Sequence, residues 1–250
     1  MTDNDTQVRP LGGAMYLYEQ PELLAYQIHH SLGLTRPDAP FEFTRTVRAI
    51  PVTINELPSV QKHYPIIFSD LEDPVLLAMI GVYEDKNLFL NSNGAWDQSA
   101  YIPAYLRCYP FAFAKNSEDE FAVVVDRAAA SISENPEVPF FKGGELTEET
   151  QAMVDFCGKY EVDRRKTSDF CKLVKSLEIL APHRAVRKTS DKEENVADYY
   201  AIDAKKLTEL DKNMVNQLFL DGSLAAMYSH LFSLENWQRL VERHNQLKAA

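Results

Sequence analysis

The densest group of side chains able to recognise a ligand lies between residues 96 and 113. Aromatic rings accompany one arginine there, and the candidate ligand-binding residues are Trp96, Tyr101, Tyr105, Arg107 and Tyr109. Aromatic rings stack on another ring or on a peptide, and a guanidinium holds a carboxylate through two parallel hydrogen bonds. The segment predicts a site for a small ligand, a peptide or a protein partner. The alternative is a core in which Arg107 pairs with Asp126 or Glu56.

Two side chains outside this segment complete the candidate ligand-binding set. His30 alternates with Ile28, Leu32 and Leu34, which predicts that it lies on the apolar face of an extended segment. A buried, hydrogen-bonded structural histidine is the alternative at this position. Asp126 ends an apolar run, where a carboxylate either serves a binding site or caps a turn.

Signatures of catalysis are absent from the sequence. It contains no GxGxxG, GxxxxGK[ST], GxSxG or HExxH string. The spacing of Cys108, Cys157 and Cys171 fits neither a metal knuckle nor a CxxC redox pair. We therefore assign no catalytic residue, no metal and no cofactor, and the sequence favours a binding protein over an enzyme. An enzyme of unknown reaction, metal-dependent through His30, His63 or Asp126, stays open as the alternative.

Composition and charge narrow the class of protein. The 250 residues include 26 Lys and Arg against 37 Asp and Glu, a formal charge of −11, and 45% are hydrophobic. These proportions are typical of a soluble globular chain. The negative balance argues against nucleic acid as a partner, because phosphate backbones bind clustered Lys and Arg. The odd number of cysteines favours a reducing compartment.

Neither a secretory signal nor a membrane-spanning stretch is predicted. The first 20 residues lack a basic segment followed by an apolar one. The longest apolar run, near residues 74–82, is far shorter than the ~20 residues needed to cross a bilayer. We expect a soluble, cytoplasmic protein that does not insert into membranes, and its ability to form a homo-oligomer stays open.

The elements that must position these residues predict an α+β fold. Residues 1–20 read as a flexible arm, and residues 21–140 as a β-rich portion with an extended stretch over 26–52. Residues 141–250 read as a helical portion with separate helices starting at Thr147 and Thr167. A polar loop is expected near 183–197, because charged residues dominate there. The β-rich and helical portions are expected to pack into one compact unit.

Several strings occur in an order that resembles the SapC family. They are HYPIIF at 63–68, NLF at 87–89, NGAW at 93–96, YIPAYLR at 101–107, YPF at 109–111, and a late block with Tyr228, His230-Leu231, Ser233-Leu234 and Arg239-Leu240. The resemblance runs from about His30 to Arg243. It implies a bacterial protein of a family named from a surface-layer locus, with an accessory role in nutrient uptake or peptide modification. A surface-layer component is the second alternative function.

Overall fold

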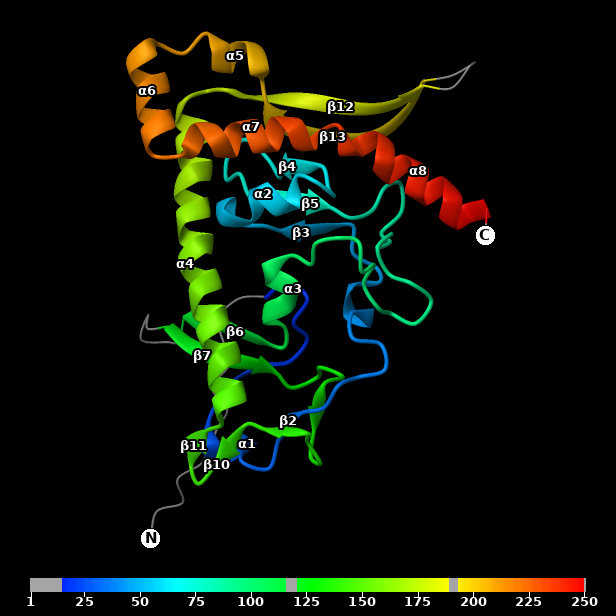
Figure 1. Cartoon of the computed structure of the whole chain (residues 1–250), viewed down its shortest axis with the longest axis vertical. Coiled ribbons are helices and arrows are strands. Elements are labelled where there is room, and N and C mark those ends of the chain that lie inside the picture. The colour runs from blue at the N-terminus through cyan, green and yellow to red at the C-terminus, as the bar shows by residue number, and fades with distance from the viewer. Residues whose placement is uncertain (1–14, 116–120, 189–192, 250) are drawn as a thin grey trace. The chain divides into compact units, whose positions relative to one another are not determined.

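A computed structural model describes residues 15–115, 121–188 and 193–249, and its fold class is α+β, as predicted (Figure 1). The chain divides into two compact units, and each is built from two separate stretches of sequence. Unit 1 comprises residues 1–43 and 106–161, and unit 2 comprises residues 44–105 and 162–250. These boundaries differ from the division at residue 140 expected from the sequence, because each unit draws on both portions of the chain.

Unit 1 contains small antiparallel sheets. One has the order β1-β7-β6 and another the order β8-β2-β9, while β10 and β11 form a hairpin. The strands are β1 (Pro21–Leu23), β2 (Gly33–Leu34), β6 (Phe111–Lys115), β7 (Phe121–Asp126), β8 (Ile132–Ser133), β9 (Val138–Pro139), β10 (Phe141–Lys142) and β11 (Glu145–Leu146). The short helix α1 (Tyr26–His29) also lies in unit 1, and the 3-10 turn η1 (Glu42–Thr44) begins in unit 1 and ends in unit 2.

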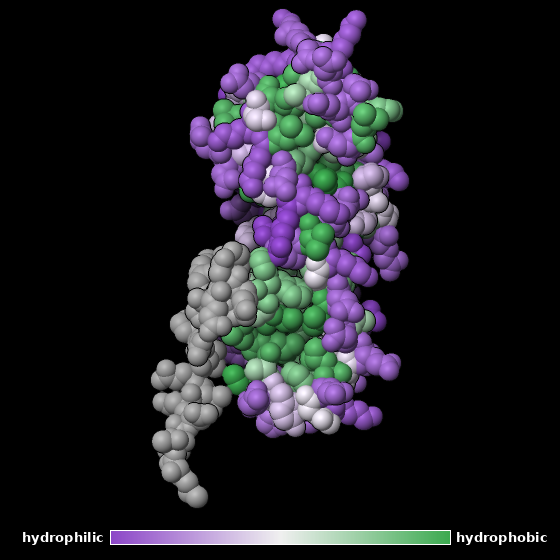
Figure 2. Space-filling model, turned by 90° about the vertical axis from the view of Figure 1, so that its left-hand side faces the viewer, coloured by the Kyte–Doolittle hydropathy of each residue, from purple (hydrophilic) through white to green (hydrophobic). Residues whose placement is uncertain are grey.

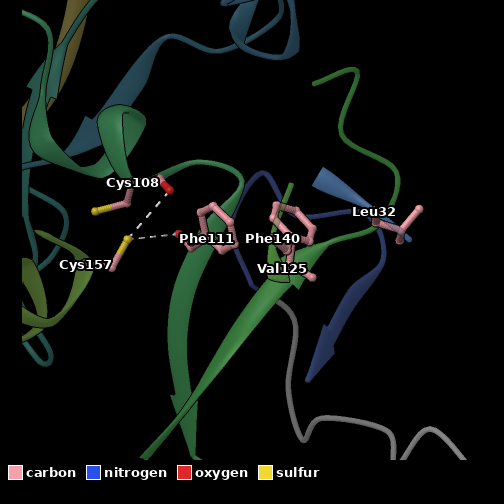
Figure 3. Close-up of a cluster of buried hydrophobic side chains, with 6 residues drawn as sticks. All are labelled: Leu32, Cys108, Phe111, Val125, Phe140 and Cys157. Carbon is pink, nitrogen blue, oxygen red and sulfur yellow. Dashed lines mark hydrogen bonds between the residues drawn. The ribbon is translucent and has the colours of Figure 1, made fainter. Parts of the chain in front are cut away.

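The core of unit 1 contains a cluster of buried apolar side chains (Figure 3). The buried cluster consists of Leu32, Cys108, Phe111, Val125, Phe140 and Cys157. The rings of Phe111 and Phe140 meet edge to face at 5.3 Å between centroids. The Cys157 thiol lies 3.7 Å from the Cys108 carbonyl and 3.6 Å from that of Phe111. The side chains of Cys108 and Cys157 are therefore part of this buried core.

Unit 2 is organised around a sheet of order β12-β13-β4-β5-β3. Its strands are β3 (Ala49–Pro51), β4 (Ile66–Phe68), β5 (Leu76–Met79), β12 (Leu180–Lys188) and β13 (Glu193–Ile202). Its helical elements are η2 (Ile54–Glu56), α2 (Leu57–Val60), α5 (Ala204–Thr208), α6 (Lys212–Leu220), α7 (Ser223–Ser233) and α8 (Asn236–Ala249). Figure 1 shows α7 running alongside the β12–β13 hairpin, which it contacts.

Two buried polar side chains attach α7 to this sheet. The Nε2 atom of His230 accepts a hydrogen bond from the Ile202 backbone at 3.1 Å, and Ser233 Oγ accepts one from Ile66 N at 2.9 Å. Burial lowers the pKa of His230 to about 3. The ring is therefore neutral near pH 7 and free to accept this hydrogen bond.

The two remaining helices belong to both units by sequence. Helix α3 (Ala104–Cys108) begins in unit 2 and ends in unit 1, and α4 (Glu148–Ser176) passes from unit 1 to unit 2 after Glu161. Helix α4 starts where predicted, and its first-turn amide at Thr150 donates to Thr147 Oγ1 at 3.3 Å.

Figure 2 shows one face of the molecule, on which hydrophilic residues predominate in the upper part.

Three local expectations were wrong. Residues 26–29 form α1 rather than an extended segment. The region 183–197 is not a loop, because in the described residues it forms the paired strands β12 and β13. No second helix starts at Thr167: its hydroxyl donates to the Asp163 carbonyl at 2.7 Å and accepts Ile54 N at 3.0 Å, inside a continuous α4.

A partly buried ion pair attaches helix α8 to the segment 88–99 of unit 2. Arg243 Nη2 donates to Asp97 Oδ2 at 2.6 Å, and Arg243 Nε donates to the Leu88 carbonyl at 2.6 Å. Ser99 donates to the other Asp97 oxygen through Oγ at 2.7 Å and through its amide at 2.9 Å. The Ser99 hydrogen bonds, and then Arg243, lower the pKa of Asp97 to about 2 against the opposing effect of burial.

We predict that Asp97→Asn destabilises the protein at neutral pH and has little effect near pH 2. A carboxylate with a lowered pKa stabilises the folded state above its unfolded pKa of about 4, and this contribution disappears as the pH falls toward about 2. The expected loss at pH 7 is about 2 kcal/mol, measured by urea unfolding at several pH values. Asp85 provides the control, because its exposed carboxylate forms an ion pair with Arg48 at 3.3 Å. Asp85→Asn should cost under about 0.5 kcal/mol. A pH-independent loss at Asp97 contradicts this assignment.

Candidate functional site

A cavity of about 480 Å³ lies within unit 1 and has a largely apolar lining. Its aromatic and basic lining side chains are Arg36, Phe41, Phe43, Arg107 and Tyr109. Three prolines, Pro37, Pro40 and Pro110, contribute to the wall, and Glu42 and Glu137 add acidic groups. The volume falls in the range of roughly 300–1,000 Å³ that is usual for small-molecule sites.

Tyr109 forms a wall of the cavity that is held from several sides. Its ring stacks on Phe43 with centroids 4.0 Å apart and an interplanar angle of 19°. Tyr18 meets the same ring edge-on at 5.3 Å. The Tyr109 hydroxyl donates to Asp126 Oδ2 at 3.0 Å. Burial, together with the charge and hydrogen bond of Asp126, raises the pKa of Tyr109, so the hydroxyl keeps its proton near neutral pH.

Asp126 is fully buried at the end of β7 and accepts hydrogen bonds from neighbouring segments. Its Oδ1 atom receives the amides of Gln20 at 2.8 Å and Ala128 at 3.2 Å. Its Oδ2 atom receives Glu19 N at 3.0 Å as well as the Tyr109 hydroxyl. These donors compensate the cost of burying a charge. Asp126 therefore positions Tyr109 and the chain before β1.

Arg107 is an exposed side chain at the end of α3, and it lines the same cavity as Tyr109. Its guanidinium carbon lies 4.9 Å from the centre of the Phe156 ring, which is a cation–π contact. Glu56 and Asp126, the two carboxylates considered as its partners, both accept hydrogen bonds from other groups. Arg36, also exposed, gives the cavity a second cationic side chain.

The other predicted aromatic residues lie in unit 2. Trp96 is buried, stacks on Phe89 at 6.1 Å and donates from Nε1 to the Tyr64 hydroxyl at 3.3 Å. The half-buried Tyr101 donates its hydroxyl to Glu56 Oε1 at 3.2 Å. Tyr105 is half-buried in the same unit. These contacts give Trp96 and Tyr101 roles in the packing of unit 2.

The structure buries His29 and leaves His30 exposed. His30 is exposed and its ring lies 5.6 Å from that of Tyr26. His29 is the fully buried one, and its Nε2 atom lies 3.1 Å from Glu22 Oε2. The expectation that His30 faces the core was wrong because this segment is helical, and the strand alternation therefore does not apply. His30 is not among the residues lining the cavity.

A larger cavity of about 660 Å³ in unit 2 lies between the β12–β13 hairpin and α8. Its arginines are engaged by neighbouring groups. Arg184 Nε donates to Asp198 Oδ1 at 2.7 Å, and Arg187 lies 3.8 Å from the Glu194 carboxylate. Because these ion pairs neutralise its cationic groups, this cavity offers a weaker anion-recognition site than the smaller one in unit 1.

Sequence reasoning did not identify Arg36, Phe41 and Phe43 as site residues. Phe41 and Phe43 resembled an alternating strand, although the chain forms η1 there. The signal that could have identified them is the proximity of Pro37 and Pro40 to one arginine and two aromatic rings, since prolines are typical of an exposed loop, where binding residues concentrate.

Among the residues that the structure describes, no three His, Cys, Asp or Glu side chains gather into a possible metal site. None of the described helices has both the length and the apolar character required to cross a bilayer.

Comparison with known proteins assigns the family. The SapC family model matches residues 24–240, which is most of the chain. The chain belongs to the SapC family. The resemblance seen in the sequence is thereby confirmed, and the match includes the cavity-lining residues of this SapC chain. None of the curated proteins and none of the solved structures compared with it gives a match.

We predict that Asp126→Asn destabilises the protein more than Tyr109→Phe. The asparagine side-chain amide would direct a donor toward backbone amides that need an acceptor, at an expected cost of about 2–4 kcal/mol. Tyr109→Phe removes one donor and leaves the carboxylate with its backbone partners, at about 1 kcal/mol. Urea unfolding measures both free energies. Equal losses would contradict the assigned role of Asp126 as the anchor of this region.

Proposed function

We propose that this protein is a non-catalytic binding protein whose unit 1 cavity recognises a short peptide or amino-acid derivative with an aromatic side chain and a carboxylate. The observation that carries the proposal is the placement of Arg107 and Tyr109 on the wall of one cavity together with Phe43. The Arg107 guanidinium can bind the carboxylate of such a ligand, and the rings of Phe43 and Tyr109 can pack against its aromatic side chain.

The aromatic part of the ligand would pack against a preformed surface. Phe41 and Phe43 have ring centroids 6.4 Å apart, and the Phe43–Tyr109 stack continues this aromatic wall. The Asp126 hydrogen bond holds the Tyr109 ring in place before any ligand arrives. A preorganised wall lowers the entropy cost of binding, since few side chains must be immobilised.

The carboxylate would be held by the arginines at the cavity. Arg107 and Arg36 are both exposed and line the cavity from different segments. Glu137 accepts the Arg36 backbone amide at 3.4 Å, so its carboxylate is partly directed toward the main chain. Peptide recognition is compatible with the accessory role in nutrient uptake or peptide modification that the family resemblance implies.

The test compares two probe ligands that differ in one charge. N-acetyl-phenylalanine carries a carboxylate, and N-acetyl-phenylalanine amide does not. We expect calorimetric titration to show the acid binding about tenfold more tightly than the amide, a difference typical of one charged hydrogen-bonded pair. Arg107→Gln should remove most of this difference, and Phe43→Ala should weaken both probes by a similar factor.

Arg127→Gln serves as the matched control. Arg127 is an arginine of unit 1 outside the cavity lining, 3.9 Å from the Glu134 carboxylate. Its removal changes the net charge by the same amount and should leave both affinities within about twofold. Binding of neither probe to the wild-type protein would refute the proposed ligand class. Equal effects of Arg107→Gln and Arg127→Gln would remove Arg107 from the site.

A further inference from the structure

A second, smaller cavity in unit 2 gathers basic side chains in a protein whose formal charge is −11. Its volume is about 300 Å³, and its lining includes Lys62, His63, Phe89, Arg239 and Arg243. Lys62 and His63 follow α2, and the two arginines lie one turn apart on α8. Such a concentration of positive charge is unusual on an acidic chain, because neighbouring like charges repel one another.

The basic groups of this cavity differ in how they are neutralised. Arg243 forms an ion pair with Asp97, with Nη2 and Oδ2 2.6 Å apart, and its guanidinium carbon lies 4.3 Å from the centre of the Phe89 ring. These two contacts hold its side chain in one position at the cavity wall. Arg239 donates from Nη1 only to neutral oxygens, Asn236 Oδ1 at 3.3 Å and the Lys62 carbonyl at 3.5 Å. Across the described part of the chain, no ion pair with a carboxylate is found for Lys62, His63 or Arg239.

The local electrostatics agree with an excess of positive charge. Burial is the largest cause of the lowered pKa of His63, and the charges of Lys62 and Arg239 lower it further, with Asp97 opposing them. One acidic side chain, Glu242, also lines the cavity, and its Oε1 atom accepts a hydrogen bond from Gln238 at 3.0 Å. After Arg243 is balanced by Asp97, Lys62 and Arg239 together exceed the single charge of Glu242.

We infer that this cavity is an anion site that binds the phosphate group of a small phosphorylated molecule, with Lys62 and Arg239 as its principal ligands. A phosphate dianion offers several acceptor oxygens, which suits the fork of a guanidinium and the point charge of an ammonium. A monoanionic carboxylate would neutralise less of the charge. The cavity is confined to unit 2, so this inference is independent of the peptide site proposed in unit 1.

The experiment uses inorganic phosphate as the probe for the full-length protein. Amide chemical shifts are followed by heteronuclear NMR during titration at constant ionic strength. We expect saturable shifts at the residues that line the cavity, in the segments 62–63, 89, 99–100 and 239–246. The expected dissociation constant is on the order of 1 mM for so small a ligand. Acetate at the same ionic strength should bind at least about fivefold more weakly.

Charge-removing variants locate the site. Lys62→Gln and Arg239→Gln each remove one exposed cation and should each weaken phosphate binding about fivefold or more. The control is Lys248→Gln, on the same helix but outside the cavity, where Lys248 pairs with Glu84 at 3.1 Å. This control should change the affinity by less than about twofold. Thermal unfolding of each variant confirms that it is folded.

Three results would overturn the inference. The first is the absence of saturable shifts at residues 62–63 and 239–246 up to about 20 mM phosphate, well above the expected dissociation constant. The second is acetate binding as tightly as phosphate. The third is an equal loss of affinity in Arg239→Gln and Lys248→Gln, which would mean that phosphate responds only to the net charge of the surface.

Discussion

The buried carboxylate of Asp126 is the group on which the arrangement of unit 1 depends. It accepts the amides of Glu19 and Gln20, an amide in its own turn, and the Tyr109 hydroxyl. A buried charge is tolerated only where donors surround it, so these segments are held together by the same requirement. The position of Tyr109, and with it the aromatic wall of the cavity, follows from this constraint.

Much of the fold could be predicted from the sequence, because local patterns specify it. The α+β class and the start of α4 after Thr147 follow from alternation and capping. Alternation also predicts paired strands over 111–114 and 121–126, and the structure extends the first of them by one residue to Lys115. The Asp203 cap of α5 is also local, since its side chain accepts Lys205 N at 2.8 Å. Local signals failed where a tertiary contact decided the outcome. Thr167 has the residue type of a helix N-cap. In the structure it lies within α4, and its hydroxyl accepts a hydrogen bond from the Ile54 backbone amide.

The candidate site was predictable only in part. Arg107, Tyr109 and Asp126 were identified from residue type, and the structure brings Tyr109 to Asp126 directly and Arg107 to the same cavity as Tyr109. Trp96 was grouped with them because it is near in sequence, and the chain instead buries it beside Phe89 in unit 2. Closeness in sequence does not place these residues in one site, because the division between the two units falls between Tyr105 and Leu106. The partners of Tyr109 came from far upstream, at Phe43 and Tyr18.

If an aromatic ligand binds in the unit 1 cavity, its ring packs against Phe43 and Tyr109. Intermolecular nuclear Overhauser effects between the ring protons of bound N-acetyl-phenylalanine and the protein would detect this packing. We expect contacts from the ligand ring to the side chains of Phe43 and Tyr109. Contacts confined to side chains outside this cavity, or no intermolecular contacts at a saturating ligand concentration, would contradict this expectation.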